Sequence, residues 1–378
     1  MEYVSTRGDT RPLPFDDVLL DGMAADGGLF VPRAWPQFGT DDIAALGDLP
    51  YDEAAVRVMA PFVGDAIPAE KFRALVSQSY AEFGHHCVAP LRQIGPGEWL
   101  LELFHGPTLA FKDIALQLLG RLFDHLLAVR GRRATIVGAT SGDTGSAAIA
   151  ACGGRENMDV FILHPRGRVS DVQRRQMTTV EDDNVHNIAV EGTFDDCQAL
   201  VKAAFADEDF RRTHHLSAVN SINWARVMAQ TVYYFTAAAS LGAPNARVSF
   251  AVPTGNFGDV YAGYAANRMG LPIGRLIVAT NVNDILTRFF ASGAYRPGSV
   301  SKTLSPSMDI QVASNFERLL FELVGRDGAA VAAFMAELRE KGVFTVPSEA
   351  LSTVADLFTA HRLDDAGTVA EILSLIHI

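Results

Sequence analysis

The sequence predicts an α/β protein in which parallel strands are covered by helices on both faces. Apolar runs without polar alternation mark the expected strands, at 134–138, 160–163, 248–252 and 276–279. Longer amphipathic stretches mark the expected helices, at 114–129, 195–205, 222–239 and 259–269. Strands that are apolar throughout and alternate with helices are typical of parallel sheets buried on both faces. The pattern therefore favours an α/β architecture of parallel sheets flanked by helices.

Composition changes along the chain divide this pattern into three parts. Residues 1–97 are mixed and helix-rich, and the alternation of strands with helices begins after them. We expect an N-terminal helix-rich segment at 1–97, a smaller α/β domain at 98–215 and a larger α/β domain at 216–378. A chain of 378 residues agrees with two or three domains and can bury a large core. Near the end, residues 347–373 are expected to be helical.

Composition and charge exclude several classes of protein. The chain is 48% hydrophobic with a net charge of −12, which indicates a soluble globular protein whose surface repels nucleic acid and anionic lipid. Cys87, Cys152 and Cys197 form no CxxC pair, so neither a disulfide framework nor a metal site is expected. No run approaches the ~18 apolar residues of a membrane helix, and the start MEYVSTRGDT lacks the pattern of a signal peptide. A cytoplasmic protein without nucleic-acid or membrane partners is expected, and the number of subunits is left open.

Two glycine-containing loops lie where α/β proteins bind ligands, between the carboxyl end of a strand and the start of a helix. Residues 140–145 (TSGDTG) combine glycines with hydroxyls, Asp143 and free helix N–H groups, which suits a small anion such as a carboxylate. Residues 253–258 (PTGNFG) contain no Lys or Arg but could hold a phosphate with backbone amides. The second loop matches neither the Walker nor the GxGxxG pattern. Read alone, each loop could also be an ordinary strand-to-helix turn.

Lys112 lies in a third loop and is the strongest candidate for chemistry. Gly106-Pro107-Thr108 interrupts the chain, and the expected helix begins just after Lys112. The helix macrodipole disfavours a cation at this end, which lowers the pKa of a lysine towards that of a usable neutral amine. The neighbours Leu109, Ala110 and Phe111 predict an apolar pocket around that amine, as Schiff-base chemistry requires. A solvated lysine near a helix is the alternative interpretation.

Together these segments resemble the threonine synthase family. LELFHGPTLAFKD at 101–113 resembles the family's cofactor-lysine motif, and ATSGDTG at 139–145, NSINWAR at 220–226 and PTGNFGD at 253–259 resemble further family segments in the right order. Other stretches resemble the family too: YVSTRG, DGGLFVP, ILHPRGRVSDVQRRQM, TNVNDIL and SPSMDI. The resemblance covers nearly the whole chain, and the lysine motif is highly specific, so the interpretation of these loops as ordinary turns loses most of its weight.

The resemblance implies the fold and the reaction of that family. The fold would be that of the tryptophan-synthase-β-like pyridoxal-phosphate enzymes (fold type II), with two α/β domains and an N-terminal segment. The reaction would convert O-phospho-L-homoserine and water to L-threonine and phosphate, a lyase step that ends threonine biosynthesis. The cofactor would be pyridoxal 5'-phosphate, which acts as the electron sink while the protein supplies orientation and electrostatics.

The resemblance also implies a role for individual residues. Lys112 would hold the cofactor aldehyde as a Schiff base and then shuttle protons at Cα and Cβ of the substrate. The cofactor phosphate would be bound by Gly255, Asn256, Phe257 and Gly258. The substrate carboxylate would be held by Ser141, Gly142, Asp143 and Thr144. The candidates for the substrate phosphate are Ser221, Asn223 and Arg226, because an arginine can pair with phosphate bidentately.

The chain departs from the family pattern at its end. Family members continue with a DPHTAVG-like segment, whose threonine would meet the pyridine nitrogen, and residues 374–378 (SLIHI) do not resemble it. The expectation is a second domain incomplete at its C-terminus. Two alternatives to a working threonine synthase are therefore kept: a related pyridoxal-phosphate amino-acid lyase or dehydratase, and an inactive ligand-binding fragment.

Overall fold

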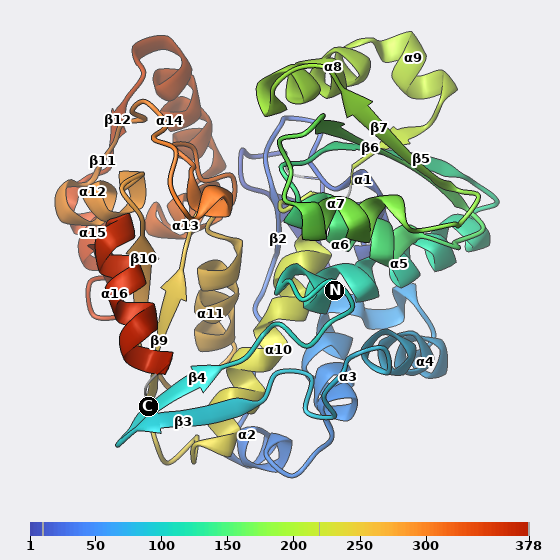
Figure 1. Ribbon diagram of the computed structural model, residues 1–378. Helices are drawn as coiled ribbons and strands as arrows, with labels where there is room; N and C mark the ends of the chain where they lie inside the picture. The colour runs from blue at the N-terminus through green and yellow to red at the C-terminus, as the bar shows by residue number, and fades with distance from the viewer. Residues whose placement is uncertain (10, 219, 377–378) are drawn as a thin grey trace.

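The computed structural model describes residues 1–9, 11–218 and 220–376. Figure 1 shows two sheet-containing lobes on either side of a central helix, with the N-terminal helices packed below and behind. The N-terminal segment begins with β1 (Tyr3–Ser5) and β2 (Phe30–Pro32), which pair antiparallel. Its helical elements are α1 (Phe15–Asp21), α2 (Thr40–Leu46), α3 (Tyr51–Val63), the 3-10 turn η1 (Gly64–Ala66) and α4 (Ala69–Tyr80). An antiparallel hairpin of β3 (Leu91–Gly95) and β4 (Glu98–Leu101) leads into the first lobe.

The first lobe contains a parallel four-stranded sheet in the order β7-β6-β5-β8. Its strands are β5 (Ala134–Ala139), β6 (Met158–Pro165), β7 (Val185–Val190) and β8 (Leu216–Ser217). Its helices are α5 (Lys112–Val129), α6 (Asp143–Cys152), α7 (Asp171–Thr178), α8 (Phe194–Ala206) and α9 (Glu208–Thr213). The inward residues Ile136, Val160 and Ile162 are buried, and the residues between them on the other face, such as Val137 and Phe161, are half-buried.

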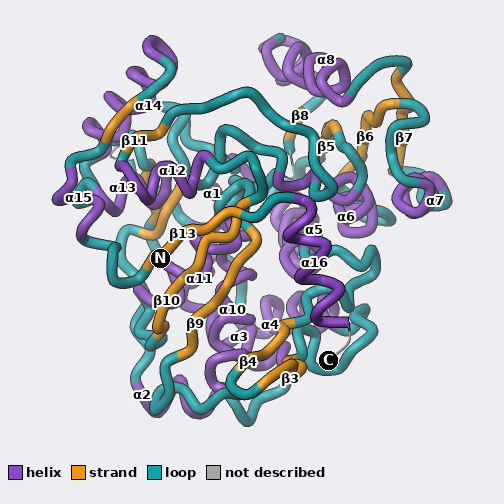
Figure 2. The backbone as a smooth tube through the Cα atoms, turned by 60° about the vertical axis from the view of Figure 1, so that its left-hand side comes forward, coloured by secondary structure: helices purple, strands orange, loops and turns teal. Residues whose placement is uncertain are grey.

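The second lobe contains a parallel three-stranded sheet in the order β13-β10-β9, whose strands lie side by side in Figure 2. The strands are β9 (Val248–Pro253), β10 (Ile273–Thr280) and β13 (Phe358–Arg362). The helices are α11 (Gly258–Arg268), α12 (Ile285–Ser292), α13 (Phe316–Leu323), α14 (Gly328–Lys341), α15 (Ser348–Ser352) and α16 (Asp365–Ile376). A two-residue ladder of β11 (Ala294–Tyr295) and β12 (Phe344–Thr345) and the 3-10 turn η2 (Pro306–Met308) complete it.

The expectation of a helix throughout 347–373 is wrong, because β13 interrupts it. Phe358 pairs with Leu276 of β10 and is buried against the rings of Phe290 and Tyr264. Pairing with the free edge of β10 outweighs the weak helical pattern of this stretch, as tertiary contacts often outweigh propensity. Of the tail 374–378, residues 377 and 378 lie outside the described part of the chain.

Helix α10 (Trp224–Ser240) lies between the lobes and is buried nearly all round (Figure 1). It packs against α3 of the N-terminal segment, α5 of the first lobe and α11 of the second. A helix that is apolar on all faces is stable only inside a protein, so α10 acts as the shared core of both lobes. The segment just before it, 220–223, therefore lies where the two lobes meet.

The expected strands and helices outside 347–373 all occur, with ends that differ by a few residues. The α/β prediction of parallel sheets flanked by helices is confirmed. The domain boundaries at 97 and 215 stay predictions. No helix among the described residues is long and apolar enough to cross a membrane.

Candidate active site

Lys112 is the first residue of α5, as the sequence predicts, and its side chain is only 12% exposed. Its Nζ lies 2.5 Å from Oδ2 of Asp143, the first residue of α6. Burial lowers the pKa of Lys112 below its ordinary value of 10.5; Asp143 opposes this shift, and the charge of Arg226 adds to it. The result is an amine that loses its proton more readily than a solvated lysine, which is the property that carbonyl chemistry requires.

Close packing of α5 on α6 brings these two residues together. A Cβ on Gly120 would lie 2.3 Å from the carbonyl oxygen of Ala151, so only glycine permits this approach. Gly120 is eight residues past Lys112, and Ala151 is eight residues past Asp143. Since α5 and α6 rise by the same distance per residue, Lys112 and Asp143 lie at the same height along the two helices, and their side chains meet.

The sequence-based idea of an apolar pocket built by the neighbours of Lys112 is only partly right. Phe111 places its ring 4.8 Å from Nζ, but Leu109 has a φ of 60° and is 67% exposed. The desolvation of Lys112 therefore comes mainly from tertiary packing. Asp113, fully buried, fixes the preceding turn by accepting hydrogen bonds from the N–H and hydroxyl of Thr108 at 2.8 and 2.7 Å.

The loop 140–145 is held in shape by a residue to which the sequence analysis gave no role. The hydroxyl oxygen of Thr140 accepts hydrogen bonds from the N–H groups of Gly142 and Gly145, at 2.9 and 2.8 Å. Gly142 has a φ of 148°, and a Cβ there would lie 2.0 Å from Oε1 of Gln173 in α7. Glycine is thus required at this turn. Ser141 is exposed, and Thr144 donates its N–H to Oδ1 of Asp143 at 2.7 Å.

Asp143 connects the two lobes. Its Oδ2 accepts a hydrogen bond of 2.7 Å from the hydroxyl of Ser307, in the turn η2 of the second lobe. Burial alone would raise the pKa of Asp143, but the Lys112 ammonium and the hydrogen bonds from Lys112 and Ser307 bring it below its ordinary value. Asp143 is therefore a carboxylate that orients the Lys112 amine.

The turn that carries Ser307 is itself fixed by a polar cluster around Asp309. Its carboxylate accepts hydrogen bonds from the side chains of Asn281, Asn283 and Thr303, at 2.8, 3.0 and 2.6 Å. Both asparagines are buried. The segments TNVNDIL and SPSMDI, noted in the sequence without a role, thus cooperate to present Ser307 to Asp143.

The loop 253–258 forms the second helix N-terminus of the site. Phe257 adopts a left-handed conformation (φ 65°) just before α11, and its ring is buried near Phe316 and Phe358. A Cβ on Gly255 would lie 3.0–3.2 Å from Ile310, the Ser307 carbonyl and Met308. The loop therefore packs beneath the same turn that reaches Asp143, with backbone N–H groups at a helix start and no charged side chain. Such a start binds phosphate through its amides.

The next acidic residue is turned away from this loop. Asp259 accepts hydrogen bonds at Oδ1 from the hydroxyls of Tyr233 and Tyr234, at 2.5 and 2.9 Å. Burial raises the pKa of Asp259 above its ordinary value, against the effect of the two tyrosines. Both features reduce the negative charge that a phosphate would meet at the start of α11.

The segment 220–226 contributes one cation to the site. Arg226 is 4% exposed, and its Nε has no hydrogen-bond partner among the described residues. Burial lowers the pKa of Arg226 to about 10, and Asp143 acts in the opposite direction. A buried guanidinium without a partner is costly, which points to an anion as its natural partner. Ser221 adds a hydroxyl 3.1 Å from that of Ser314.

Asn223, the third phosphate candidate, makes two structural hydrogen bonds. Its Oδ1 accepts from the N–H of Ala225 and so caps α10, and its Nδ2 donates to the carbonyl of Leu19 at 2.8 Å. Such a cap stabilises a helix by about 1 kcal/mol. Because its amide is used for these contacts and is 1% exposed, we leave Asn223 out of the proposed ligand set.

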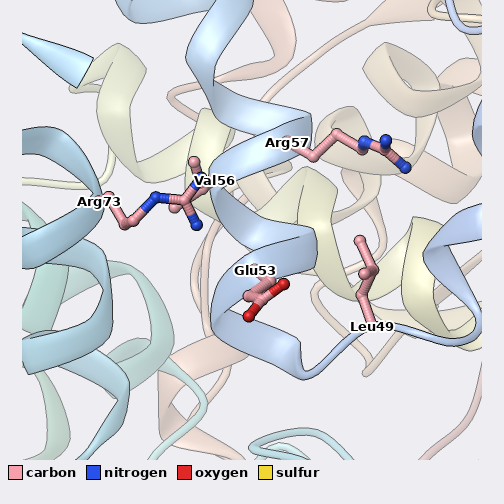
Figure 3. A pocket seen from close by; sticks show the side chains of 5 residues that line it. All are labelled: Leu49, Glu53, Val56, Arg57 and Arg73. Carbon is pink, nitrogen blue, oxygen red and sulfur yellow. The ribbon is translucent and has the colours of Figure 1, made fainter. Parts of the chain in front are cut away.

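Surface hollows elsewhere do not share these features. The hollow in Figure 3, about 300 Å³, is lined by Glu53, Val56 and Arg57 of α3, Arg73 of α4 and Leu49 of the turn before α3. None of these residues contributes to the loops around Lys112. Among the described residues, no group of three or more His, Cys, Asp or Glu side chains could hold a metal ion.

Comparison with known proteins identifies the family. The family description "Threonine synthase N terminus" matches residues 2–80, and "Pyridoxal-phosphate dependent enzyme" matches residues 87–374. A threonine synthase of Pseudomonas aeruginosa is 56% identical over 375 residues, which cover 98% of this chain and 80% of that protein. The chain belongs to the threonine synthase family. The cofactor of the family, pyridoxal phosphate, is therefore the cofactor of this chain.

Solved structures of the threonine synthase family superpose closely on the chain. A pyridoxal-phosphate-bound threonine synthase from Brucella melitensis has a TM-score of 0.98 and 57% identity, covering 100% of this chain and 81% of that one. Maize serine racemase, at 14% identity and a TM-score of 0.53, shares the fold alone. The predicted family, the fold type II architecture, the cofactor and the threonine synthase function, a lyase of threonine biosynthesis, are confirmed. The relatives support this function and neither alternative.

The described residues fit the cofactor of the threonine synthase family. A desolvated lysine suits the aldehyde, and a glycine loop with unshielded amides suits the phosphate. Three residues near the site were not predicted from the sequence: Ser307, which bonds to Asp143, and the neighbours Ser314 and Asn315, which contact Ser221. Ser307 lies in a segment that resembles the family, which was a usable signal, whereas Ser314 and Asn315 lie in no motif that was recognised.

Proposed function

We propose that the chain converts O-phospho-L-homoserine and water to L-threonine and phosphate, with Lys112 as the residue that holds the cofactor and moves protons. The observation that carries this proposal is the largely buried Lys112–Asp143 pair; the charge of Arg226 acts on this lysine, and Nε of Arg226 has no hydrogen-bond partner among the described residues. The start of α6 then serves the carboxylate of the substrate, the buried cation serves its phosphate, and the start of α11 serves the cofactor phosphate.

Each proposed role follows from the contacts of the residue. The amides of Gly255, Asn256, Phe257 and Gly258 hold the cofactor phosphate at the start of α11. The loop of Ser141, Gly142, Asp143 and Thr144, at the start of α6, holds the substrate carboxylate through backbone N–H groups and hydroxyls, while the Asp143 side chain faces Lys112. Ser221 and Arg226 hold the substrate phosphate, because Arg226 is buried and its Nε has no partner in the part of the chain that the structure describes.

The chemistry requires protons to move at Cα, Cβ and Cγ. Pyridoxal phosphate supplies the electron sink for negative charge at Cα and Cβ. The neutral Nζ of Lys112 removes and returns protons at these carbons, and Asp143 orients it through the contact at 2.5 Å. Overall, Cβ loses one proton and gains the hydroxyl of water, while Cγ loses phosphate and gains a proton, becoming the methyl group of threonine. Arg226 neutralises the phosphate as it leaves.

The cellular setting is part of the proposal. The three cysteines Cys87, Cys152 and Cys197 are unpaired thiols, which agrees with a reducing cytoplasm. The net charge of −12 argues against a nucleic-acid partner. The proposed partners are therefore the substrate and the cofactor.

Phosphate release and threonine formation from O-phospho-L-homoserine test the reaction directly. In the same assay, Arg226→Gln removes the proposed phosphate cation while keeping hydrogen-bonding capacity. We expect KM for the substrate to rise by about tenfold to a hundredfold, since a buried charged hydrogen bond of about 1.5–3 kcal/mol is lost. Arg247→Gln, in the loop before β9, is the matched control. An unchanged KM in Arg226→Gln would remove Arg226 from the site, and an enzyme that releases no phosphate would contradict the proposed reaction.

A further inference from the structure

The segment Ser314–Asn315 touches both of the proposed phosphate-binding loops. The N–H of Asn315 donates to the carbonyl of Asn256 at 2.9 Å, and the hydroxyl of Ser314 donates to Oδ1 of Asn256 at 3.1 Å. On the other side, Nδ2 of Asn315 donates to the carbonyl of Ser221 at 3.1 Å, and the hydroxyls of Ser314 and Ser221 are 3.1 Å apart. Each of the two residues therefore contacts the cofactor-phosphate loop and the substrate-phosphate segment at once.

The Asn315 side chain is committed to this bridge rather than to its own helix. Asn315 occupies the N-cap position of α13, where asparagine usually accepts a hydrogen bond from the helix start, but it makes no side-chain cap. It is fully buried, and a Cβ on Gly258 would lie 3.3 Å from its Nδ2. The Asn315 side chain therefore bonds to Ser221 and Arg318 rather than to the start of its own helix.

A buried arginine fixes the orientation of the Asn315 amide. Arg318 is fully buried and donates from Nη1 to Oδ1 of Asn315, so that Nδ2 must face Ser221. The same guanidinium donates from Nη2 to the carbonyl of Ile222 at 2.5 Å and from Nε to that of Phe30 at 3.0 Å. Burial lowers the pKa of Arg318 to about 10. Arg318 thus anchors the bridge to the segment before α10.

We infer that Ser314 and Asn315 are positioning residues that set the spacing between the cofactor-phosphate loop and the substrate-phosphate segment. The inference rests on the proposed function of these two loops. Neither residue needs to touch cofactor or substrate. Loss of the bridge releases Asn256 and Ser221 together, so it weakens two binding events that are otherwise separate.

Ser314→Ala removes the hydroxyl contacts while keeping the backbone, and Asn315→Asp keeps the acceptor for Arg318 but loses the donor to Ser221. We expect each variant to weaken pyridoxal phosphate binding about threefold to tenfold and to raise KM for O-phospho-L-homoserine by a similar factor, as for one lost buried hydrogen bond. We expect kcat to change less. Ser314→Thr, which keeps the hydroxyl, should restore both constants. Cofactor affinity is read by titration of the apoprotein and does not depend on turnover.

Matched controls separate positioning from general stability. Ser79→Ala removes a fully buried hydroxyl from α4, and Asn267→Asp removes an amide donor to the carbonyl of Leu271 after α11. Both controls should lower the melting temperature as much as the test variants, with cofactor affinity and KM unchanged. The double variant Ser221→Ala/Ser314→Ala should cost less in KM than the product of the single effects, because the two hydroxyls share one contact.

The possible results separate a failure of this inference from a failure of the proposed function. If the unmodified protein binds cofactor and releases phosphate but Ser314→Ala and Asn315→Asp change both constants no more than the controls, the inference fails alone. Effects on KM without any effect on cofactor affinity would also overturn it, since the bridge joins both loops. If the unmodified protein neither binds cofactor through Lys112 nor releases phosphate, the proposed function fails and the inference fails with it.

Discussion

The loops 140–145 and 253–258 have the same local architecture but different chemistry. Each follows the carboxyl end of a parallel strand, turns through glycine and starts a helix, α6 in one lobe and α11 in the other. In the first loop, Asp143 starts the helix and points at Lys112. In the second, Asp259 is held by Tyr233 and Tyr234, and residues 253–258 contain no charged side chain. One loop therefore orients a reacting amine, and the other suits a phosphate.

The difference shows that glycine content alone does not define such a loop. Backbone N–H groups at a helix start attract anions in both cases. What distinguishes them is where the nearest carboxylate lies: Asp143 is matched by the cation Lys112, whereas Asp259 has a raised pKa and neutral partners. The predictions below test the charged loop and the neutral loop separately.

Lys112→Ala should have the largest effect, because it removes the reacting group of the charged loop. We expect loss of the borohydride-reducible linkage to pyridoxal phosphate and a fall in threonine formation of at least about a thousandfold, with the fold retained. Mass spectrometry after reduction and circular dichroism measure these outcomes. Lys202→Ala, at an exposed position of α8, is the control. A reducible linkage that persists in Lys112→Ala would show that another residue holds the cofactor.

Gly255→Val should have the next largest effect, on the neutral loop. The new side chain would meet Ile310, the Ser307 carbonyl and Met308 at 3.0–3.2 Å, so the loop or the turn above it must move. We expect cofactor affinity, measured by titration, to fall at least about tenfold, since amides that bind phosphate must be placed accurately. The control is Gly39→Val, where the backbone is extended and the nearest contact is 3.5 Å away. Equal affinity in Gly255→Val and the parent would remove this loop from the cofactor site.

Asp143→Asn should shift the pH dependence of cofactor attachment. The neutral amine of Lys112 reacts, so the rate of linkage formation rises with pH through a pKa that burial lowers below 10.5. Asp143 raises that pKa, and its removal should therefore move the midpoint to lower pH. Rapid-mixing absorbance across a pH series measures the midpoint. Asp159→Asn, which breaks a surface pair with Arg133, should leave it in place. A shift to higher pH in Asp143→Asn would contradict the proposed electrostatics.

Asn256→Ala should have the smallest effect. The proposed phosphate contacts of this loop are backbone amides, and the Asn256 side chain accepts only from Ser314 at 3.1 Å. We expect cofactor affinity to fall about threefold, in line with one neutral hydrogen bond. Titration of Asn256→Ala and Gly255→Val with pyridoxal phosphate compares the losses of cofactor affinity in the two variants. A loss in Asn256→Ala as large as that in Gly255→Val would mean that the side chain, rather than the backbone, binds the phosphate.

The amino-acid sequence by itself determined the elements with strong local patterns. The apolar runs at 134–138 and 248–252 became β5 and β9, and Lys112 lies at a helix start as its surroundings predict. These features depend on residues a few positions apart, whose periodicity and glycines are visible in the chain. The resemblance to the threonine synthase family added the cofactor and the reaction, which no local pattern contains.

Only the tertiary structure decided which side chains meet. Strand β13 forms because β10 offers it an edge, Asn223 bonds to a carbonyl 204 residues away, and Leu109 is exposed although it lies three residues from Lys112. Ser307 and Ser314 reach Asp143 and Ser221 across 164 and 93 residues of chain. Such contacts are set by how helices and sheets pack, through close approaches such as Gly120 on Ala151, and packing depends on the whole core rather than on any local run of residues.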